Sequence, residues 1–170
     1  MSLNTKSKTS RKVFLINRSK DDRLIKSLVT AAGTLFIKVV DGRIYLLLIS
    51  YTDQRYSLLD DLGGRAEVYD KSIYQTIDRE VKEESNEIIQ IDSENLECTS
   101  VYMPECKYLC LITKLNEDAY PDTSIFGTLE HTNQLKRTIE WHEFTDQLKP
   151  KLSHRIRQQS IYDELLKLVK

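Results

Sequence analysis

Short runs rich in β-branched and aliphatic residues, separated by polar turns, cover much of the chain. The Asp41-Gly42 pair between two such runs predicts a two-residue β-hairpin. Pro104-Glu105 indicates a second turn between two later runs. We therefore expect strands near residues 12–17, 28–40, 43–50, 96–103, 107–115 and 138–144.

Between the early and the late strands, the spacing of apolar residues changes to the period of an amphipathic helix. Its apolar stripe consists of Tyr74, Ile77, Val81 and Ile88. Ser72 is placed to cap the start of this helix, and Gln75, three residues later, to return the bond as in a capping box. Asn86 is expected to end the helix, because asparagine tolerates a left-handed backbone better than other residues that carry a Cβ.

A second helix is expected to begin at Ser153 and to pack on the sheet through Ile156, Ile161, Leu165 and Leu168. This order of strands and helices predicts the α/β class. The chain has 170 residues, 40% of them hydrophobic, which is enough for one domain with a sizeable core. We expect residues 1–12 to form a disordered tail and residues 13–170 to form a single domain.

Composition excludes several classes of protein. No run of 18 apolar residues and no signal-peptide pattern is present, so we expect a cytoplasmic protein without a membrane partner. Cys98, Cys106 and Cys110 include no CxxC pair, and the three histidines fall at no zinc-like spacing. We therefore expect the cysteines to be reduced and a soft-metal site to be absent.

Candidate chemistry lies on the first helix, where Glu80, Glu83 and Glu84 fall within an arc of roughly 100°. Residues 60–97 contain twelve Asp and Glu against four Lys and Arg. Clustered carboxylates suit a hard divalent cation, so Mg²⁺ or Mn²⁺ is expected here. The competing interpretation is a solvated helix face, on which Arg79 and Lys82 pair with these glutamates for a few tenths of a kcal/mol each.

Residues 63–89 resemble the signature box of the Nudix hydrolases. The core Arg79–Glu84, REVKEE, matches in full, Gly63 and Gly64 match the glycine turn, and Glu67 matches a frequent acidic position. Asp70 stands where the family has its first box glutamate. The chain departs from the box in this shorter acid, in one extra residue before Arg79, and in Asn86-Glu87 at the end.

The resemblance implies a fold, a metal and roles for particular residues. It implies an α/β/α sandwich around a central mixed sheet, in which residues 30–38 and 139–144 form core strands. The expected metal ligands are Gly63, through its carbonyl, with Glu80, Glu83 and Glu84, while Asp70 and Arg79 support the box. Glu83, Glu84 and a loop acid are the expected catalytic residues; Glu130 is the leading candidate for that acid, and Glu140 the second. Trp141, Tyr108 and Tyr120 are candidates to stack on a base, although packing is the ordinary role of such aromatics.

The function that follows is metal-dependent hydrolysis of a diphosphate linkage in a nucleoside diphosphate derivative, by a water that attacks phosphorus. One alternative is a catalytically silent protein of this fold that binds a nucleotide or RNA. Another is an enzyme acting on capped RNA, for which a modest basic cluster is available at Lys136, Arg137, Lys149, Lys151, Arg155 and Arg157. The full set of box glutamates favours an enzyme with a small nucleotide substrate; a homodimer stays open.

Overall fold

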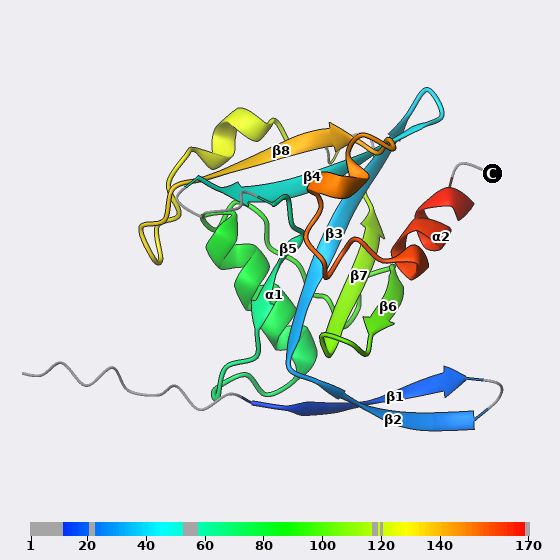
Figure 1. Cartoon of the computed structure of the whole chain (residues 1–170). Helices are drawn as coiled ribbons and strands as arrows, with labels where there is room; N and C mark the ends of the chain where they lie inside the picture. Colours follow the sequence, from blue (N-terminus) through cyan, green and yellow to red (C-terminus); the bar gives the residue numbers. More distant parts are fainter. Residues whose placement is uncertain (1–11, 21–22, 53–57, 117–118, 120, 169–170) are drawn as a thin grey trace, which may run out of the picture.

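The computed structural model describes residues 12–20, 23–52, 58–116, 119 and 121–168, and these form two sheets, two α-helices and short 3-10 helices. The main sheet has six strands in the order β6-β7-β3-β4-β8, with β5 paired to β3 (Figure 1). In chain order the elements are β1 (Phe14–Lys20), β2 (Arg23–Val29), β3 (Ala31–Val40), β4 (Arg43–Tyr51), β5 (Leu62–Arg65), α1 (Ile73–Glu84), β6 (Thr99–Met103), β7 (Tyr108–Lys114), the 3-10 helix η2 (Thr123–Phe126), β8 (Arg137–Glu143), the 3-10 helix η3 (Lys149–Lys151) and α2 (Gln159–Lys167).

The sheet is mixed, as the sequence analysis predicts. β3 runs parallel to β7 and antiparallel to β4 and β5. The β3–β4 turn is the expected hairpin, with Asp41 at φ 50° and Gly42 at φ 73°. Two successive left-handed residues match the right-handed twist of the strands that they join.

Alternate residues of the central strands point to opposite faces of the sheet, and each face is covered by one helix (Figure 1). On one face Ala32 and Phe36 of β3 belong to the same buried cluster as Ile77 and Val81 of α1. Burial of a side chain of the size of Phe36, Ile77 or Val81 contributes roughly 2 kcal/mol. On the other face the buried side chains that pack together are Leu35, Ile37, Ile161 and Leu165. The result is the predicted α/β/α arrangement.

The predicted run 28–40 is divided between two sheets. β2 pairs with β1 in a separate two-stranded ribbon that projects beyond the main sheet in Figure 1, whereas β3 belongs to the main sheet. The chain changes partners at Thr30, whose backbone amide donates to Lys107 O and whose carbonyl accepts from Ala66 N. Of the predicted tail, residues 1–11 lie outside the described residues, and Lys12 N donates to Ala66 O.

The start of the last helix was predicted wrongly: α2 begins at Gln159, not at Ser153. Ser153 N donates to Leu59 O at 2.8 Å, and Ser153 Oγ donates to Asp60 Oδ1 at 2.7 Å. These bonds hold the segment against the chain before β5, and an earlier helix would break them. Ile156 is nevertheless fully buried, and Leu168 packs against the core.

Candidate active site beside helix α1

Helix α1 forms for the local reasons expected and is capped almost as predicted. Ser72 Oγ accepts a hydrogen bond from Gln75 N at 3.2 Å. The Gln75 side chain, however, accepts from Lys71 N at 2.8 Å, so the second bond of the predicted capping box is shifted by one residue. The helix ends at Glu84, and Asn86 and Glu87 follow with φ values of 56° and 66°.

Ile88 therefore lies beyond the helix and is exposed, contrary to its predicted place in the apolar stripe. The face that α1 buries consists of Ile73, Thr76, Ile77, Val81 and Glu84. A carboxylate at the end of a buried helical face needs polar partners.

The paired glycines form a strand and not the expected turn. Gly63 lies opposite Gly33 within the β3–β5 ladder, and a Cβ on Gly63 would sit 2.4 Å from Gly33 Cα and 2.4 Å from the Tyr108 hydroxyl oxygen. A Cβ on Gly64 would sit 2.4 Å from Glu80 Cδ. Glycine is needed here for close approach: β5 packs against its neighbours, and the Glu80 carboxyl group lies directly over the strand.

Because of these contacts, we expect alanine to have different effects at the two glycines. Gly63→Ala should lower the free energy of unfolding by about 3 kcal/mol, because its Cβ meets backbone and a buried hydroxyl that cannot withdraw. Gly64→Ala should lower it by under about 1 kcal/mol, since the Glu80 side chain can swing aside, but should reduce any activity that needs Glu80. Urea denaturation of both variants measures the difference; equal losses would contradict this account.

Glu84 is buried and held at both oxygens. Gly63 N donates to Glu84 Oε2 at 2.8 Å, and the Tyr51 hydroxyl lies 3.0 Å from Glu84 Oε1. The same hydroxyl lies 2.9 Å from Oε2 of Glu130, a buried residue of the segment between η2 and β8. Tyr51 has a single hydroxyl proton, so one of its two contacts requires a proton on a carboxyl group. The three side chains thus form one hydrogen-bonded chain.

Burial disfavours the charged form of both Glu84 and Glu80. Burial, followed by the charge of Glu80, raises the pKa of Glu84 well above its ordinary value. Burial also raises the pKa of Glu80, although Arg79 Nη1 lies 2.7 Å from Glu80 Oε1 and opposes the shift. A cation nearby would therefore favour the ionised form of both carboxyl groups.

The remaining predicted acids lie apart from this group. Glu83 is partly exposed on the outer side of α1, where Oε2 lies 3.4 Å from Arg79 Nη1. Glu140 projects from β8 on the opposite face to its neighbours Ile139 and Trp141, which pack with the α1 side of the core, so it does not reach the group around Glu84.

Arg79 and Asp70 are paired, as the sequence predicts. Arg79 Nε lies 3.1 Å from Asp70 Oδ1, and Arg79 Nη2 lies 3.1 Å from Asp70 Oδ2 and 2.9 Å from Arg65 O. Asp70 also accepts from the Thr76 hydroxyl and from Glu67 N. Burial alone would raise the pKa of Asp70, but these bonds, that from Arg79 foremost, lower it. The pair joins α1 to the loop after β5.

A second polar cluster beneath Gly63 was missed by the sequence analysis. Asp61 is fully buried and accepts a hydrogen bond of 2.8 Å from the Tyr108 hydroxyl. Arg155 Nε lies 2.7 Å from Asp60 Oδ1 and 3.2 Å from Asp61 Oδ1, and its Nη2 donates to Gly63 O at 3.0 Å. Burial raises the pKa of Asp61 to about 7, although Arg155 opposes the shift. The Asp60-Asp61 pair, separated from the glycines by Leu62, was the available signal.

This cluster involves two residues for which other roles were expected. The Gly63 carbonyl, expected to face a metal, accepts from Arg155, and the Gly63 contact with the carboxylates is made by its amide. Tyr108 is buried and bonded to Asp61, so it cannot stack on a base. Trp141 donates to Pro121 O, and the Lys38 ammonium lies 4.5 Å from its ring centroid. Tyr120 lies outside the described residues.

The residues present fit a hard cation held by few protein ligands. Among the residues that the structure describes, no three His, Cys, Asp or Glu side chains are arranged as a ready-made metal site. Arg79 Nη1 contacts both Glu80 Oε1, at 2.7 Å, and Glu83 Oε2, at 3.4 Å, and Glu83 is the more exposed of the two. Glu80 and Glu84 lie one helical turn apart, with ionisation disfavoured by burial. Mg²⁺ is commonly bound by one or two carboxylates that are completed by water and substrate phosphates.

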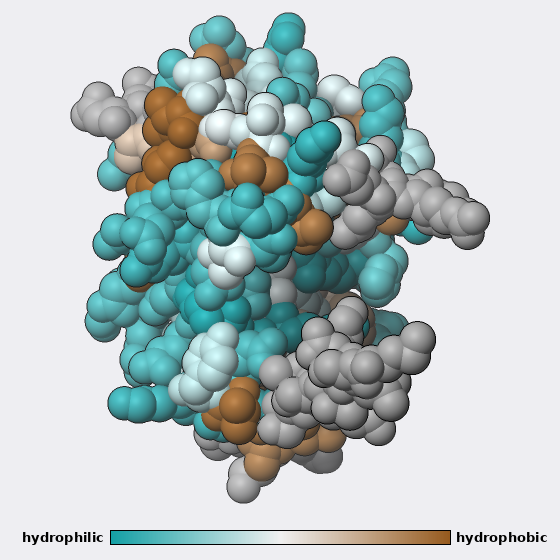
Figure 2. Space-filling view, turned by 90° about the vertical axis from the view of Figure 1, so that its left-hand side faces the viewer, coloured by the Kyte–Doolittle hydropathy of each residue, from teal (hydrophilic) through white to brown (hydrophobic). Residues whose placement is uncertain are grey.

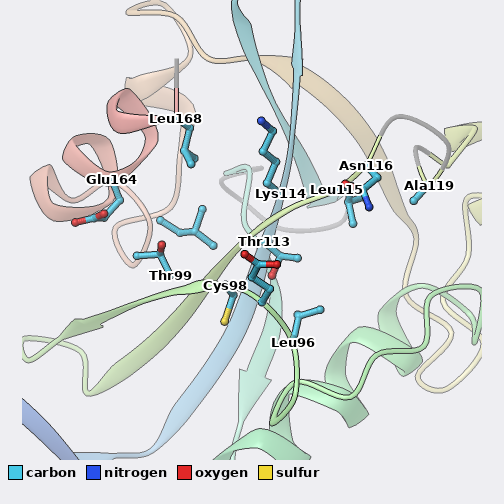
Figure 3. A pocket seen from close by; sticks show the side chains of 12 residues that line it. Leu96, Cys98, Thr99, Thr113, Lys114, Leu115, Asn116, Ala119, Glu164 and Leu168 are labelled. Carbon is cyan, nitrogen blue, oxygen red and sulfur yellow. The ribbon is translucent and has the colours of Figure 1, made fainter. Parts of the chain in front are cut away.

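The surface on the α1 side is predominantly hydrophilic, with hydrophobic residues in small patches (Figure 2). A pocket of about 420 Å³ adjoins the outer face and end of α1 and includes Arg79, Glu83, Asn86 and His131. A larger pocket of about 640 Å³ lies elsewhere, between the ends of β6 and β7 and the end of α2, where Thr99, Lys114 and Leu168 line it (Figure 3). None of the box glutamates contributes to that larger pocket.

Neither α1 nor α2, the two α-helices within the described part of the chain, is long and apolar enough to cross a membrane.

Solved structures share this architecture. A binary complex of an Ap4A hydrolase from C. elegans is 21% identical, with a TM-score of 0.53 over 83% of this chain and 97% of that one. The NUDIX domain of Shewanella oneidensis NrtR, complexed with ADP ribose, is 16% identical, with a TM-score of 0.55 over 82% of this chain and 88% of that one. No protein-family model and no curated protein matches the sequence. The likeness in structure shows that the chain adopts the Nudix fold.

Proposed function

We propose that the protein is a metal-dependent hydrolase of a diphosphate linkage in a nucleoside diphosphate derivative. The observation that carries the proposal is the buried Glu84 carboxyl, which lies beside Glu80 and meets Gly63 N and, through the Tyr51 hydroxyl, Glu130. A buried group of acids of this kind is costly for a purely structural helix end, and a bound cation offsets that cost.

Glu80 and Glu84 would hold Mg²⁺ or Mn²⁺, and the Gly63 carbonyl, which also accepts from Arg155, is proposed as a further ligand through its second lone pair. When bound, the cation would neutralise developing charge on the phosphate oxygens and lower the pKa of a bound water. Glu130 is proposed as the group that accepts the proton of the attacking water, with Tyr51 linking it to Glu84. Glu83, on the outer side of α1, is proposed to orient water or to join the ligands when it leaves Arg79.

Small nucleotides remain ahead of capped RNA as substrates. The basic cluster considered for RNA loses Arg137, which is buried and donates to Phe126 O and Gly127 O, and Arg155, which is committed to Asp60 and Gly63. Long RNA needs an extended array of accessible cations, and these two side chains do not contribute to one. The alternative of a silent nucleotide-binding protein is supported by the burial of Glu84, whose two carboxyl oxygens are bonded to Gly63 N and the Tyr51 hydroxyl.

Hydrolysis is expected to require a divalent metal. The test is a phosphate-release screen over nucleoside diphosphate derivatives, including ADP ribose and Ap4A, and short capped RNAs, with Mg²⁺, with Mn²⁺ and with excess chelator. We expect turnover of at least one small nucleotide that disappears in chelator and returns with added metal, because without a bound cation the carboxylates of Glu80 and Glu84 would repel the substrate phosphates. Undiminished turnover in chelator would refute the metal mechanism. Metal-dependent binding without turnover would favour the silent protein.

A further inference from the structure

The segment between η2 and β8 carries Glu130, and one side chain at the end of α1 holds it. Asn86 Nδ2 donates to Phe126 O at 3.1 Å and to Leu129 O at 2.9 Å. Asn86 Oδ1 accepts from His131 N at 2.8 Å. The amide thus contacts the backbone on both sides of Glu130, and both its donors and its acceptor are used.

Backbone geometry alone does not account for an asparagine at this position. Asn86 has φ 56°, a conformation that glycine adopts at the least cost. Glu87, the next residue, has φ 66°, and its exposed side chain forms an ion pair with Lys82 of α1. The left-handed conformation at Glu87 thus accompanies local contacts with Lys82, whereas Asn86 adds three hydrogen bonds across 40 to 45 residues of chain.

The segment is fixed from its other side by β8. Arg137 Nη1 donates to Phe126 O at 2.9 Å and to Gly127 O at 2.8 Å. Glu130 N donates to Leu135 O, which closes the turn that leads into β8. Held between Asn86 and Arg137, the Glu130 carboxyl is buried and lies 2.9 Å from the Tyr51 hydroxyl.

We propose that Asn86 is a positioning residue, which sets the place of Glu130 relative to Tyr51 and Glu84 by clamping the backbone on both sides of Glu130. The effect of Asn86 on turnover rests on the proposed hydrolase function. Asn86 touches neither substrate nor metal in this scheme. It acts through Glu130, so its removal should impair the reaction step and leave substrate affinity nearly intact.

The test compares Asn86→Gly, which keeps the backbone conformation and removes the side chain, with Glu87→Gly, a matched change at the neighbouring left-handed residue. On the best substrate of the screen, Asn86→Gly should lower kcat by about tenfold or more with KM within about twofold. Glu87→Gly should match wild type. Glu130→Gln should lower kcat by about 100-fold, and adding Asn86→Gly to it should cause no further loss.

Hydrogen exchange of the backbone amides in residues 128–134, without substrate, is the second readout. Exchange there should speed up in Asn86→Gly and stay as in wild type in Glu87→Gly. If wild type cleaves nothing, the hydrolase proposal fails, and exchange alone then decides whether Asn86 holds the segment. Unchanged exchange, or a loss of kcat that adds in full to that of Glu130→Gln, overturns the inference. If Asn86→Gly fails to fold, Asn86→Asp, which keeps the acceptor for His131 N and loses both donors, replaces it with the same expected results.

Discussion

Replacing Glu84 with glutamine should lower the rate of hydrolysis by about 100-fold or more, because the change removes the charge that would hold the cation. The fold should survive, since glutamine matches the existing bonds. Its amide oxygen can accept from Gly63 N, its amide nitrogen can donate to the Tyr51 oxygen, and Tyr51 can then donate to Glu130. Steady-state kinetics with Mg²⁺ measure the effect.

Stability of the metal-free protein should change in the opposite direction. The folded protein binds a proton at Glu84 more tightly than the unfolded chain does, because burial raises the pKa of Glu84. Ionisation of Glu84 therefore destabilises the wild type as pH rises above the unfolded pKa of about 4.3 and through the folded pKa. Glutamine does not ionise, so the Tm of Glu84→Gln minus that of wild type should grow over this range.

Glu140→Gln is the matched control, since this exposed glutamate lies on the opposite face of the sheet. Its rate should stay within about twofold of wild type, because exposed substitutions distant from the chemistry have small effects. Should Glu84→Gln retain activity within about threefold of wild type, the activity does not arise at α1 and the assignment of the site is wrong.

Arg79→Ala should lower the free energy of unfolding by about 3 kcal/mol, because removing one partner of a buried ion pair leaves the other charge uncompensated. Asp70 has a side-chain exposure of 3% and would lose both bonds to Arg79. The hydrogen bond from Arg79 to Arg65 O, next to the paired glycines, would be lost as well. Urea denaturation measures the stability, and the rate should fall with it, because the loop after β5 would no longer be joined to α1.

Lys82→Ala provides the comparison on the same helix. Lys82 is exposed and pairs with Glu87 at 3.6 Å, so its loss should cost under about 0.5 kcal/mol. An Arg79→Ala protein as stable and active as Lys82→Ala would support the interpretation of this helix face as ordinary solvated surface.

Features that depend on residues close together in sequence were predicted well. The Ser72 cap at the start of α1, the left-handed end at Asn86 and the Asp41-Gly42 hairpin all involve groups a few residues apart. Their energies come from hydrogen bonds and steric limits within one turn, which the local sequence contains. The spacing of Glu80, Glu83 and Glu84 placed them on one helix for the same reason.

Features that depend on distant partners were decided by the tertiary structure. The paired glycines are a strand because β3 accepts them as a neighbour, and α2 starts late because Ser153 and Arg155 are bonded to Asp60. Packing of α1 and of the segment before β8 against the end of β4 brings Tyr51 to Glu84, 33 residues away, and to Glu130, 79 residues away. Periodicity told us that the box glutamates share a helix face, but not that Glu84 is buried while Glu83 is turned to Arg79. That choice depends on which polar partners the folded chain supplies at each position, and no local pattern encodes them.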